Sequence, residues 1–239
     1  MNCVVVGYGF VGKATARYLE QFDIDIHLHD PEQGYSANKN IDYDFIFYCL
    51  PTNLKNGKLD ISILKEEYGT WDGEQIIRST IGPDQVDEFE NPTMWPEFLR
   101  EITWEDQLSQ PEVENVIGRS GSSYFSFWLQ GETKVTEVTA KEAAMFKMSR
   151  NAFLSMKVIF ANILNDNCNK NDVNYYTVKQ LLKKNIDPTT HLDVPGPDGK
   201  FGFGGKCLPK DTTHYQSLSN DTLFMAVLGC NEIARDFPK

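Results

Sequence analysis

A glycine-rich hexapeptide near the start of the chain limits the fold more than any other stretch. Residues 2–6 are apolar, as in a buried parallel strand, and Gly7–Gly12, with the sequence GYGFVG, follows at once. An amphipathic helix is expected over about residues 11–22, and a second strand over residues 24–30 ends in Asp30. The order strand, G-x-G-x-x-G, helix, strand, acidic residue predicts the α/β class, with a Rossmann-like doubly wound parallel sheet.

The same motif predicts a dinucleotide ligand. Its first glycine makes the tight turn, its second lets a pyrophosphate approach the backbone, and its third lets the helix pack on the strand. Because the carboxylate of Asp30 accepts from ribose hydroxyls and repels the extra phosphate of NADP, we expect NAD. The alternative, a glycine-rich turn without a ligand, is disfavoured by this context. The expected cofactor residues of the motif are Gly7, Gly9, Phe10, Val11, Gly12 and Asp30.

Two further buried strands are expected over residues 44–50 and 75–81. Thr52, Ser79 and Thr80 follow or end these strands, so their hydroxyls should point toward one crevice beyond the carboxyl ends of the sheet. Each is alternatively a turn-forming hydroxyl, and this is the expected role of Ser79. A helix capped by Asp60, short strands at 115–118 and 135–138, and an ambiguous aromatic segment at 120–130 complete this half.

The apolar spacing in the second half of the chain predicts helices. One long helix is expected over about residues 139–167, with further helices over 173–185, 211–219 and 223–237. The chain would thus divide into a dinucleotide-binding domain, residues 1–138, and an all-helical domain, residues 139–239, whose long central helix forms a homodimer surface. Eight apolar residues of that helix recur at helical spacing and are expected to face a core: Ala143, Phe146, Ala152, Phe153, Met156, Phe160, Ile163 and Leu164. Lys147 and Asn151 lie four apart, so they share a face and can polarise an oxyanion, although an exposed pair is the commoner arrangement.

Cys207 lies in the segment Gly202–Asp211, with the sequence GFGGKCLPKD. Pro209 suits the first turn of a helix, which would put the cysteine just before the helix N-terminus. The helix dipole, Lys206 and Lys210 then favour the thiolate, which is the nucleophilic form. The alternative is a small buried cysteine in an ordinary loop.

Composition excludes several classes of function. A formal net charge of −11 argues against nucleic acid or a membrane surface as a partner. The five cysteines are widely spaced and contain no C-x-x-C pair, which disfavours disulfides or a zinc site and indicates a reducing compartment. No signal peptide or membrane-spanning run is recognised, so a cytoplasmic protein without a metal is expected.

Four stretches together resemble the UDP-glucose/GDP-mannose 6-dehydrogenase family of nucleotide-sugar enzymes. They are Gly7–Gly12, Pro96–Glu101, Lys147–Leu154 and Gly202–Asp211, which occur in the family's order. The last of them is the most specific, and the resemblance extends from residue 2 to about Asn231.

The resemblance implies a four-electron oxidation of a hexose C6 alcohol to a carboxylate with NAD, as in polysaccharide biosynthesis. Cys207 matches the family's nucleophile, which forms a thiohemiacetal and then a thioester. Lys147 and Asn151 match the groups that stabilise the oxyanion. Other matches are Asp211 and Thr80, which position water or move protons, and Glu97, the carboxylate of thioester hydrolysis. The substrate residues implied are Glu97, Phe98, Leu99, Lys147, Asn151, Phe203 and Gly204, and the further cofactor residues are Pro51, Thr52, Thr80 and Lys210.

Two of the chain's departures from the family affect whole structural elements. Only a short connection joins Asp30 to Asp44, where the family has a further helix and strand pair. The family's C-terminal nucleotide-binding domain has no counterpart in these 239 residues, so we expect a short form. Two other functions stay open: an NAD(H)-binding module without turnover, and a one-step hydroxyacid dehydrogenase, which would not need Cys207.

Overall fold

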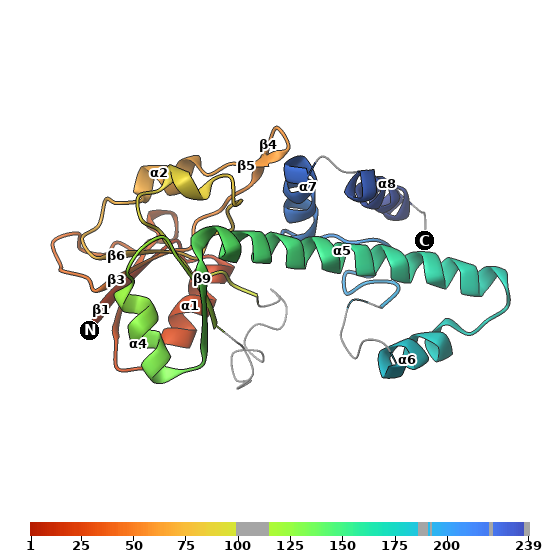
Figure 1. The fold of residues 1–239 in the computed structure, drawn as a ribbon, viewed down its shortest axis with the longest axis horizontal. Helices are drawn as coiled ribbons and strands as arrows, with labels where there is room; N and C mark the ends of the chain where they lie inside the picture. Colours follow the sequence, from red (N-terminus) through yellow and green to blue (C-terminus); the bar gives the residue numbers. More distant parts are fainter. Residues whose placement is uncertain (99–114, 186–190, 192, 220–221, 237–239) are drawn as a thin grey trace. The chain divides into compact units, whose positions relative to one another are not determined.

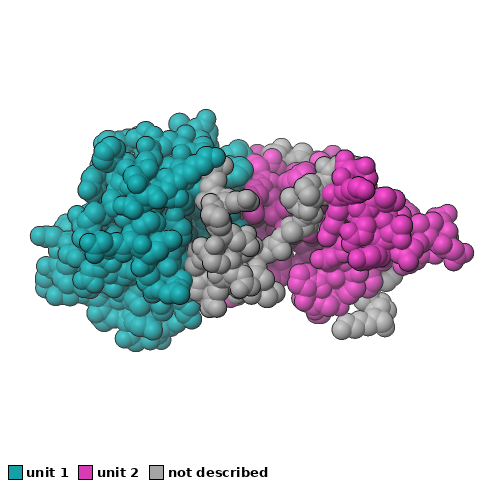
Figure 2. Space-filling view, turned by 90° about the horizontal axis from the view of Figure 1, so that it is seen from below, with its two compact units in different colours: residues 1–55, 59–147 teal, residues 56–58, 148–239 magenta. Residues whose placement is uncertain are grey.

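A computed structural model describes residues 1–98, 115–185, 191, 193–219 and 222–236. The chain forms two compact units, residues 1–55 with 59–147 and residues 56–58 with 148–239, coloured separately in Figure 2. The change of unit falls within helix α5 (Ala140–Lys170). The domain limits drawn from the sequence, 1–138 and 139–239, stay a prediction.

Seven strands form the sheet of the first unit, in the order β2-β1-β3-β6-β7-β8-β9. All neighbours are parallel except β7 and β8, so the last two strands run against the others, a detail that the sequence did not reveal. This mostly parallel sheet confirms the expected α/β class. The strands are β1 (Asn2–Val6), β2 (Asp25–His29), β3 (Phe45–Tyr48), β6 (Glu74–Ile77), β7 (Thr93–Met94), β8 (Asn115–Arg119) and β9 (Val135–Thr139).

Helices cover both faces of this sheet (Figure 1). Strand β1 sends Val4 and Val6 into one apolar core and Cys3 and Val5 into the other, as expected of a parallel strand buried on both sides. Helices α1 (Phe10–Leu19) and α4 (Tyr124–Glu132) pack on the second core, while α2 (Ser62–Glu67) and the first turns of α5 pack on the first. The ambiguous aromatic segment is therefore largely helical, and Ser123 caps α4 by accepting from the N–H of Ser126.

Helix α5 begins where a capping box forms. Thr139 Oγ1 accepts from the N–H of Glu142, and the Glu142 carboxylate accepts from the N–H of Thr139 at 2.7 Å. Ala143 and Ala152 are buried as expected, but Phe146, Phe153, Phe160 and Ile163 are each about half exposed. The expectation that these four residues face a core of the chain was wrong, because the apolar positions of α5 occupy more of its circumference than one packed face.

The second unit is helical, as expected. Besides α5 it contains α6 (Tyr175–Asn185), α7 (Leu208–Ser219) and α8 (Thr222–Asp236).

Two 3₁₀ turns and a small hairpin are the remaining elements that the structure describes: Pro31–Gln33, Val86–Glu88, β4 (Leu54–Lys55) and β5 (Lys58–Leu59). Asp60 accepts from the N–H of Ser62, yet it precedes the N-cap of α2, Ile61, by one residue.

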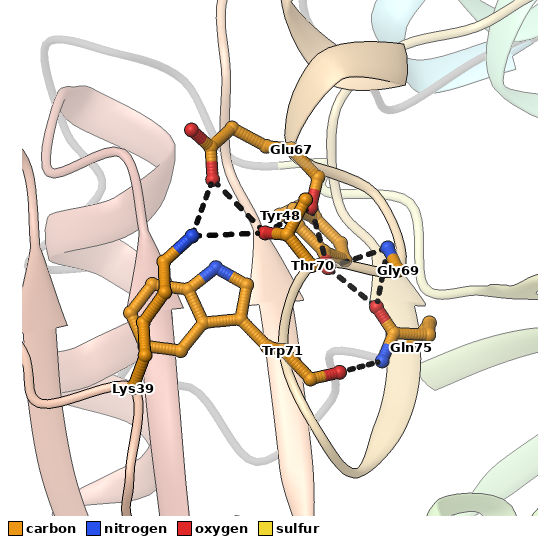
Figure 3. Close-up of polar contacts among 7 residues, drawn as sticks. All are labelled: Lys39, Tyr48, Glu67, Gly69, Thr70, Trp71 and Gln75. Atoms are coloured by element: carbon orange, nitrogen blue, oxygen red, sulfur yellow. Dashed lines mark hydrogen bonds and ion pairs between the residues drawn. The ribbon is translucent and has the colours of Figure 1, made fainter.

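A buried tyrosine fixes the chain that follows α2 to the sheet (Figure 3). The hydroxyl of Tyr48 lies 3.2 Å from the carbonyl oxygen of Glu67, accepts from the N–H of Gly69 at 3.2 Å and contacts the side-chain oxygen of Gln75. The Gln75 amide donates in turn to the carbonyl of Trp71 at 2.9 Å. Burial raises the pKa of Tyr48, so the hydroxyl keeps its proton.

Tyr48→Phe should lower the free energy of unfolding by about 1–2 kcal/mol, because the hydroxyl of this fully buried residue loses its hydrogen bonds with Glu67, Gly69 and Gln75 while the ring packing is kept. Urea unfolding followed by circular dichroism measures the change. Tyr124→Phe is the matched control, because Tyr124 is 55% exposed. Equal effects of the two substitutions would contradict a structural role for the Tyr48 hydroxyl.

Candidate functional site

The glycine loop joins β1 to α1 and leaves the start of that helix open. Gly7 donates to the carbonyl of His29 at 2.8 Å, and Lys13 closes the first helical turn by donating to the carbonyl of Gly9. Gly9 is the N-cap of α1, and no described side chain caps this N-terminus. A helix N-terminus that begins in this way, here with the half-buried Phe10 and Val11, favours an anion beside it.

Two glycines of this loop serve different purposes. A Cβ on Gly12 would lie 2.0 Å from the carbonyl oxygen of Gly7, so close helix packing requires glycine there. A Cβ on Gly9 would meet nothing within 4 Å, and the Gly9 φ of −71° is open to any residue. The fold of the unit thus does not need a glycine at position 9, whereas a phosphate lying against the backbone would.

Asp30 lies beside this loop at the end of β2. Its carboxylate accepts from the N–H of Tyr8 at 2.8 Å and from the backbone and side-chain nitrogens of Gln33 at 3.2 and 2.8 Å. Partial burial alone would raise the pKa of Asp30, but these hydrogen bonds hold it below its ordinary value. A carboxylate has about four acceptor positions, so the ionised side chain keeps capacity for one more donor, such as a ribose hydroxyl.

The segments after β3 and β6 are linked by hydroxyl groups. Ser79 Oγ accepts from the N–H of Leu50 at 2.9 Å and donates to the backbone, which confirms its structural role. Thr52 is buried and donates to the carbonyl of Thr80 at 2.7 Å, so these two predicted site residues are in contact. Thr80 is half-buried and Pro51 is exposed.

Glu97 and Lys147 also meet within the first unit. Both are at least nine-tenths buried, and Lys147 Nζ donates to the backbone carbonyl of Glu97. The same ammonium lies 5.3 Å from the centroid of the Phe98 ring. Leu99, the remaining predicted residue of this stretch, lies outside the described residues.

Arg78 is a buried cation that the sequence analysis missed. It is 6% exposed, its Nε donates to Thr15 of α1 at 2.9 Å, and its guanidinium lies 3.8 Å from the centroid of the Trp95 ring. Burial lowers the pKa of Arg78 from its ordinary value, with the nearby Cys49 and Glu97 acting in the opposite direction. Its place directly after β6 is readable from the sequence, but nothing in the sequence indicates that the side chain turns inward.

Cys207 occupies the N-cap of α7, as the sequence predicted. Its carbonyl accepts from the N–H of Asp211 at 2.9 Å, and the residue is half-buried. Burial raises the pKa of Cys3 to about 12 and that of Cys49 to about 11, so these two thiols are unreactive core groups. Cys207 differs from these two thiols in its position at a helix N-terminus, which favours the thiolate.

The glycine segment before Cys207 is held against α8. Asn231 accepts from the N–H of Phe203 at 2.7 Å and donates to its carbonyl at 3.1 Å. Gly202 has a φ of +70°, and a Cβ on it would lie 2.5 Å from Asn231 Oδ1, so only glycine suits this position. A Cβ on Gly204 would meet the guanidinium of Arg235, which pairs with Asp198 at 2.7 Å. The sequence did not indicate these two hydrogen bonds of Asn231.

A buried carboxylate links α7 to α5 in the second unit. Asp211 is fully buried, and one of its oxygens accepts from Asn151 Nδ2 at 2.5 Å while the other pairs with Lys210 Nζ at 2.6 Å. Asn151 is 4% exposed, so it and Lys147, one turn earlier on α5, are not an exposed pair. Three predicted residues, Asn151, Lys210 and Asp211, are thus in direct contact.

Two negative observations apply to the part of the chain that the structure describes. No group of three or more His, Cys, Asp or Glu side chains is placed to hold a metal ion there. No described helix combines the length and the apolar character needed to cross a bilayer.

Part of the chain is similar in sequence to known dehydrogenases. Residues 141–232 match the model of the UDP-glucose/GDP-mannose dehydrogenase family, central domain. A UDP-glucose 6-dehydrogenase of Rhizobium meliloti is 32% identical over 158 residues, which are 62% of this chain and 34% of that protein. The part of the chain from residue 141 to residue 232 is therefore similar to the central domain of this family. The chain spans about a third of the length of the Rhizobium meliloti protein.

The fold agrees with this family and also with a second class of dehydrogenase. A UDP-glucose dehydrogenase from Pyrobaculum islandicum superimposes with a TM-score of 0.76 at 20% identity, covering 97% of this chain and 68% of that chain. A 3-hydroxyisobutyrate dehydrogenase from Mycobacterium tuberculosis gives 0.73 at 14% identity, covering 98% and 94%. At such identities the likeness shows the fold alone, so the site residues must decide the chemistry.

Asp30→Asn should destabilise the protein in a pH-dependent way. Because the folded pKa of Asp30 is lowered, its carboxylate adds stability above its unfolded pKa and loses that contribution as the pH falls through the folded pKa. The difference in unfolding free energy between wild type and variant should therefore shrink from about pH 6 to about pH 3. Urea unfolding across this range measures it, with exposed Asp23→Asn as control. A difference independent of pH would contradict this role.

Proposed function

We propose that this chain is the NAD-binding and catalytic portion of a nucleotide-sugar 6-dehydrogenase that oxidises a hexose C6 alcohol to a carboxylate. The observation that carries the proposal is the arrangement around the N-terminus of α7. Cys207 is its N-cap, and one turn later Asp211 is buried between Asn151 and Lys210. These are residues that match the family's catalytic set, and buried polar groups in direct contact are typical of catalytic sites.

NAD fits the first unit. The open N-terminus of α1, the empty space above Gly9 and the ionised Asp30 match the phosphates and a ribose of a dinucleotide. Phe10, Val11, Pro51, Thr52 and Thr80 are the further cofactor residues of the proposal, together with Lys210 from the second unit. When bound, NAD supplies the electron acceptor for each of the two oxidations.

The chemistry assigned to the protein centres on Cys207. After the first oxidation of the alcohol, the Cys207 thiolate adds to the aldehyde carbon and forms a C–S bond, which gives a thiohemiacetal. The second oxidation leaves a thioester. Water then adds to the thioester carbonyl, the C–S bond breaks, and the carboxylate leaves as the thiolate is restored.

Other residues stabilise charge or move protons in this scheme. Lys147 and Asn151 are donors one turn apart on α5, and they would stabilise the oxyanion that forms when the thiolate or water adds. Asp211 and Thr80 would position water or relay protons, and the Glu97 carboxylate would assist the hydrolysis of the thioester. Glu97, Phe98, Leu99, Phe203 and Gly204 would bind the sugar nucleotide.

Two alternatives differ in their need for the thiol. A one-step hydroxyacid dehydrogenase is favoured by the likeness to the Mycobacterium tuberculosis fold, but such an enzyme forms no thioester. An NAD(H)-binding module without turnover has no physical need for a thiol at the N-terminus of α7.

We also infer that the protein forms a homodimer through α5. Phe153 and Phe160 lie seven residues apart and Ile163 follows, and each is more than half exposed. Large apolar side chains at helical spacing mark a surface that another subunit can cover.

Gly9→Ala should separate cofactor binding from stability. The free energy of unfolding should change by no more than about 0.5 kcal/mol, since the added methyl meets no atom, while NADH binding should weaken about tenfold or more. Isothermal titration calorimetry and urea unfolding give the two values. Gly131→Ala in α4, where a methyl also meets nothing, is the matched control and should leave binding unchanged. Unchanged NADH binding in Gly9→Ala would overturn the assigned phosphate site.

The enzymatic proposal is tested by NADH formation with UDP-glucose, GDP-mannose and UDP-N-acetylmannosamine. Wild type should form two NADH per uronate, and Cys207→Ser should lose uronate formation on the order of 10³-fold or more, because the thioester cannot form. Cys230→Ser, at an exposed cysteine of α8, should behave as wild type. NADH formation that survives in Cys207→Ser would favour the one-step enzyme. Binding of NADH without turnover on any of these sugars would favour the module.

A further inference from the structure

Two buried hydroxyl groups are in contact next to the candidate catalytic residues Asn151 and Asp211. Ser155 on α5 and Thr212 on α7 are both fully buried, and their oxygens lie 2.6 Å apart. Ser155 follows Asn151 by one turn of α5, and Thr212 follows Asp211 directly. The hydroxyl pair therefore joins the same two helices as the bond between Asn151 and Asp211.

The direction of these hydrogen bonds is determined by counting protons. Each hydroxyl has one proton, and Ser155 Oγ donates to the carbonyl of Asn151 at 2.9 Å. Thr212 must consequently donate to Ser155. The resulting chain runs from Thr212 through Ser155 to the backbone of Asn151, whose side chain donates to Asp211 at 2.5 Å.

Apolar packing between the helices cannot set this geometry by itself. Leu208 and Tyr215 of α7 pack with Ala152 and Met156 of α5 in one cluster, but such contacts are non-directional. Two adjacent hydrogen-bonded pairs fix both the rotation and the translation of one helix against the other, because each tolerates only a narrow range of distance and angle. Breaking one pair would also leave a buried polar group unsatisfied.

We propose that Thr212 and Ser155 are positioning residues that set the register of the cysteine helix on α5. Their hydroxyl pair keeps Asp211 in contact with Asn151, and so holds the first turn of α7, with Cys207 at its N-cap, in the geometry that the reaction needs. This inference rests on the proposed function for its effect on turnover. It also has a consequence at the Cys207 thiol that does not depend on turnover.

The expected consequence at the thiol has a definite sign. If the Asp211 carboxylate loses its contact with Asn151, less of its negative charge is neutralised by that amide. A less neutralised carboxylate one turn from Cys207 disfavours the thiolate, so the pKa of the thiol should rise. Lys206, directly before Cys207, and Lys210, in the first turn of α7, are the other charged residues next to the thiol in sequence, and the substitutions below leave them unchanged.

The test is Thr212→Val, which removes the hydroxyl while keeping the side-chain shape. Alkylation of Cys207 by iodoacetamide, read by mass spectrometry of its peptide, should have a pH profile displaced upward by about half a unit or more. With a nucleotide sugar that turns over, kcat should fall about 10- to 100-fold while KM stays within about threefold. Thr212→Ser, which restores the hydroxyl, should recover both values.

Thr213→Val is the matched control, because the neighbouring Thr213 hydroxyl donates within its own helix, to the carbonyl of Pro209 at 2.8 Å. It should leave both readouts as in wild type. Ser155→Ala is the second variant, and the double variant should be no worse than either single one if the two hydroxyls act as a unit. It also serves where Thr212→Val does not fold.

Several results would overturn the proposal. They are a wild-type alkylation profile in stable Thr212→Val, equal effects of Thr212→Val and Thr213→Val, or additive effects of Thr212→Val and Ser155→Ala. If no sugar is turned over by any form of the protein while the alkylation profile still moves, the positioning role stands and the proposed enzymatic function fails.

Discussion

The fully buried carboxylate of Asp211 is the constraint on which the arrangement of the second unit depends. An ionised carboxylate without partners in a protein interior is strongly unfavourable, so its two oxygens must be satisfied by nearby donors. Asn151 and Lys210 provide them, one from α5 and one from the same turn of α7. The requirement to satisfy one charge therefore determines which face of the cysteine helix lies against α5.

The first unit places its own polar groups inside the protein in a similar way. Lys147 is 7% exposed yet donates to a backbone carbonyl, and Arg78 is 6% exposed and lies against the Thr15 hydroxyl and the Trp95 ring. Neither arrangement is one that stability alone would favour, because apolar side chains of similar volume would avoid the desolvation of two cations. Buried cations of this kind are instead suited to developing negative charge, which the proposed oxidation creates at an oxyanion.

The sequence predicted the fold well where local signals were strong. The strand and G-x-G-x-x-G pattern located β1, α1 and β2, and Pro209 correctly predicted that α7 begins beside Cys207. Prediction failed where tertiary packing decides. The aromatic run 120–130 has no clear period, yet its phenylalanine at position 125 fills the core beneath the sheet and makes the segment helical. The half-exposed phenylalanines of α5 show the converse, because periodicity marks apolar faces without telling which of them the chain itself covers.

The same limit applies to the site. Residue types identified the cysteine helix, because a thiol before a proline-containing first turn has a local physical meaning. Asn151 was singled out by its spacing to Lys147, and Asp211 by the resemblance to the family. Asn231, Arg78 and the pair Ser155 and Thr212 were missed, since each acts through a contact between segments distant in sequence. A Rossmann-like sheet followed by helices accommodates one-step oxidation of a small hydroxyacid as readily as oxidation through a thioester, so the fold leaves the reaction undecided. The proposed oxidation through a thioester requires a reactive cysteine such as one at a helix N-terminus, whereas one-step oxidation requires no thiol.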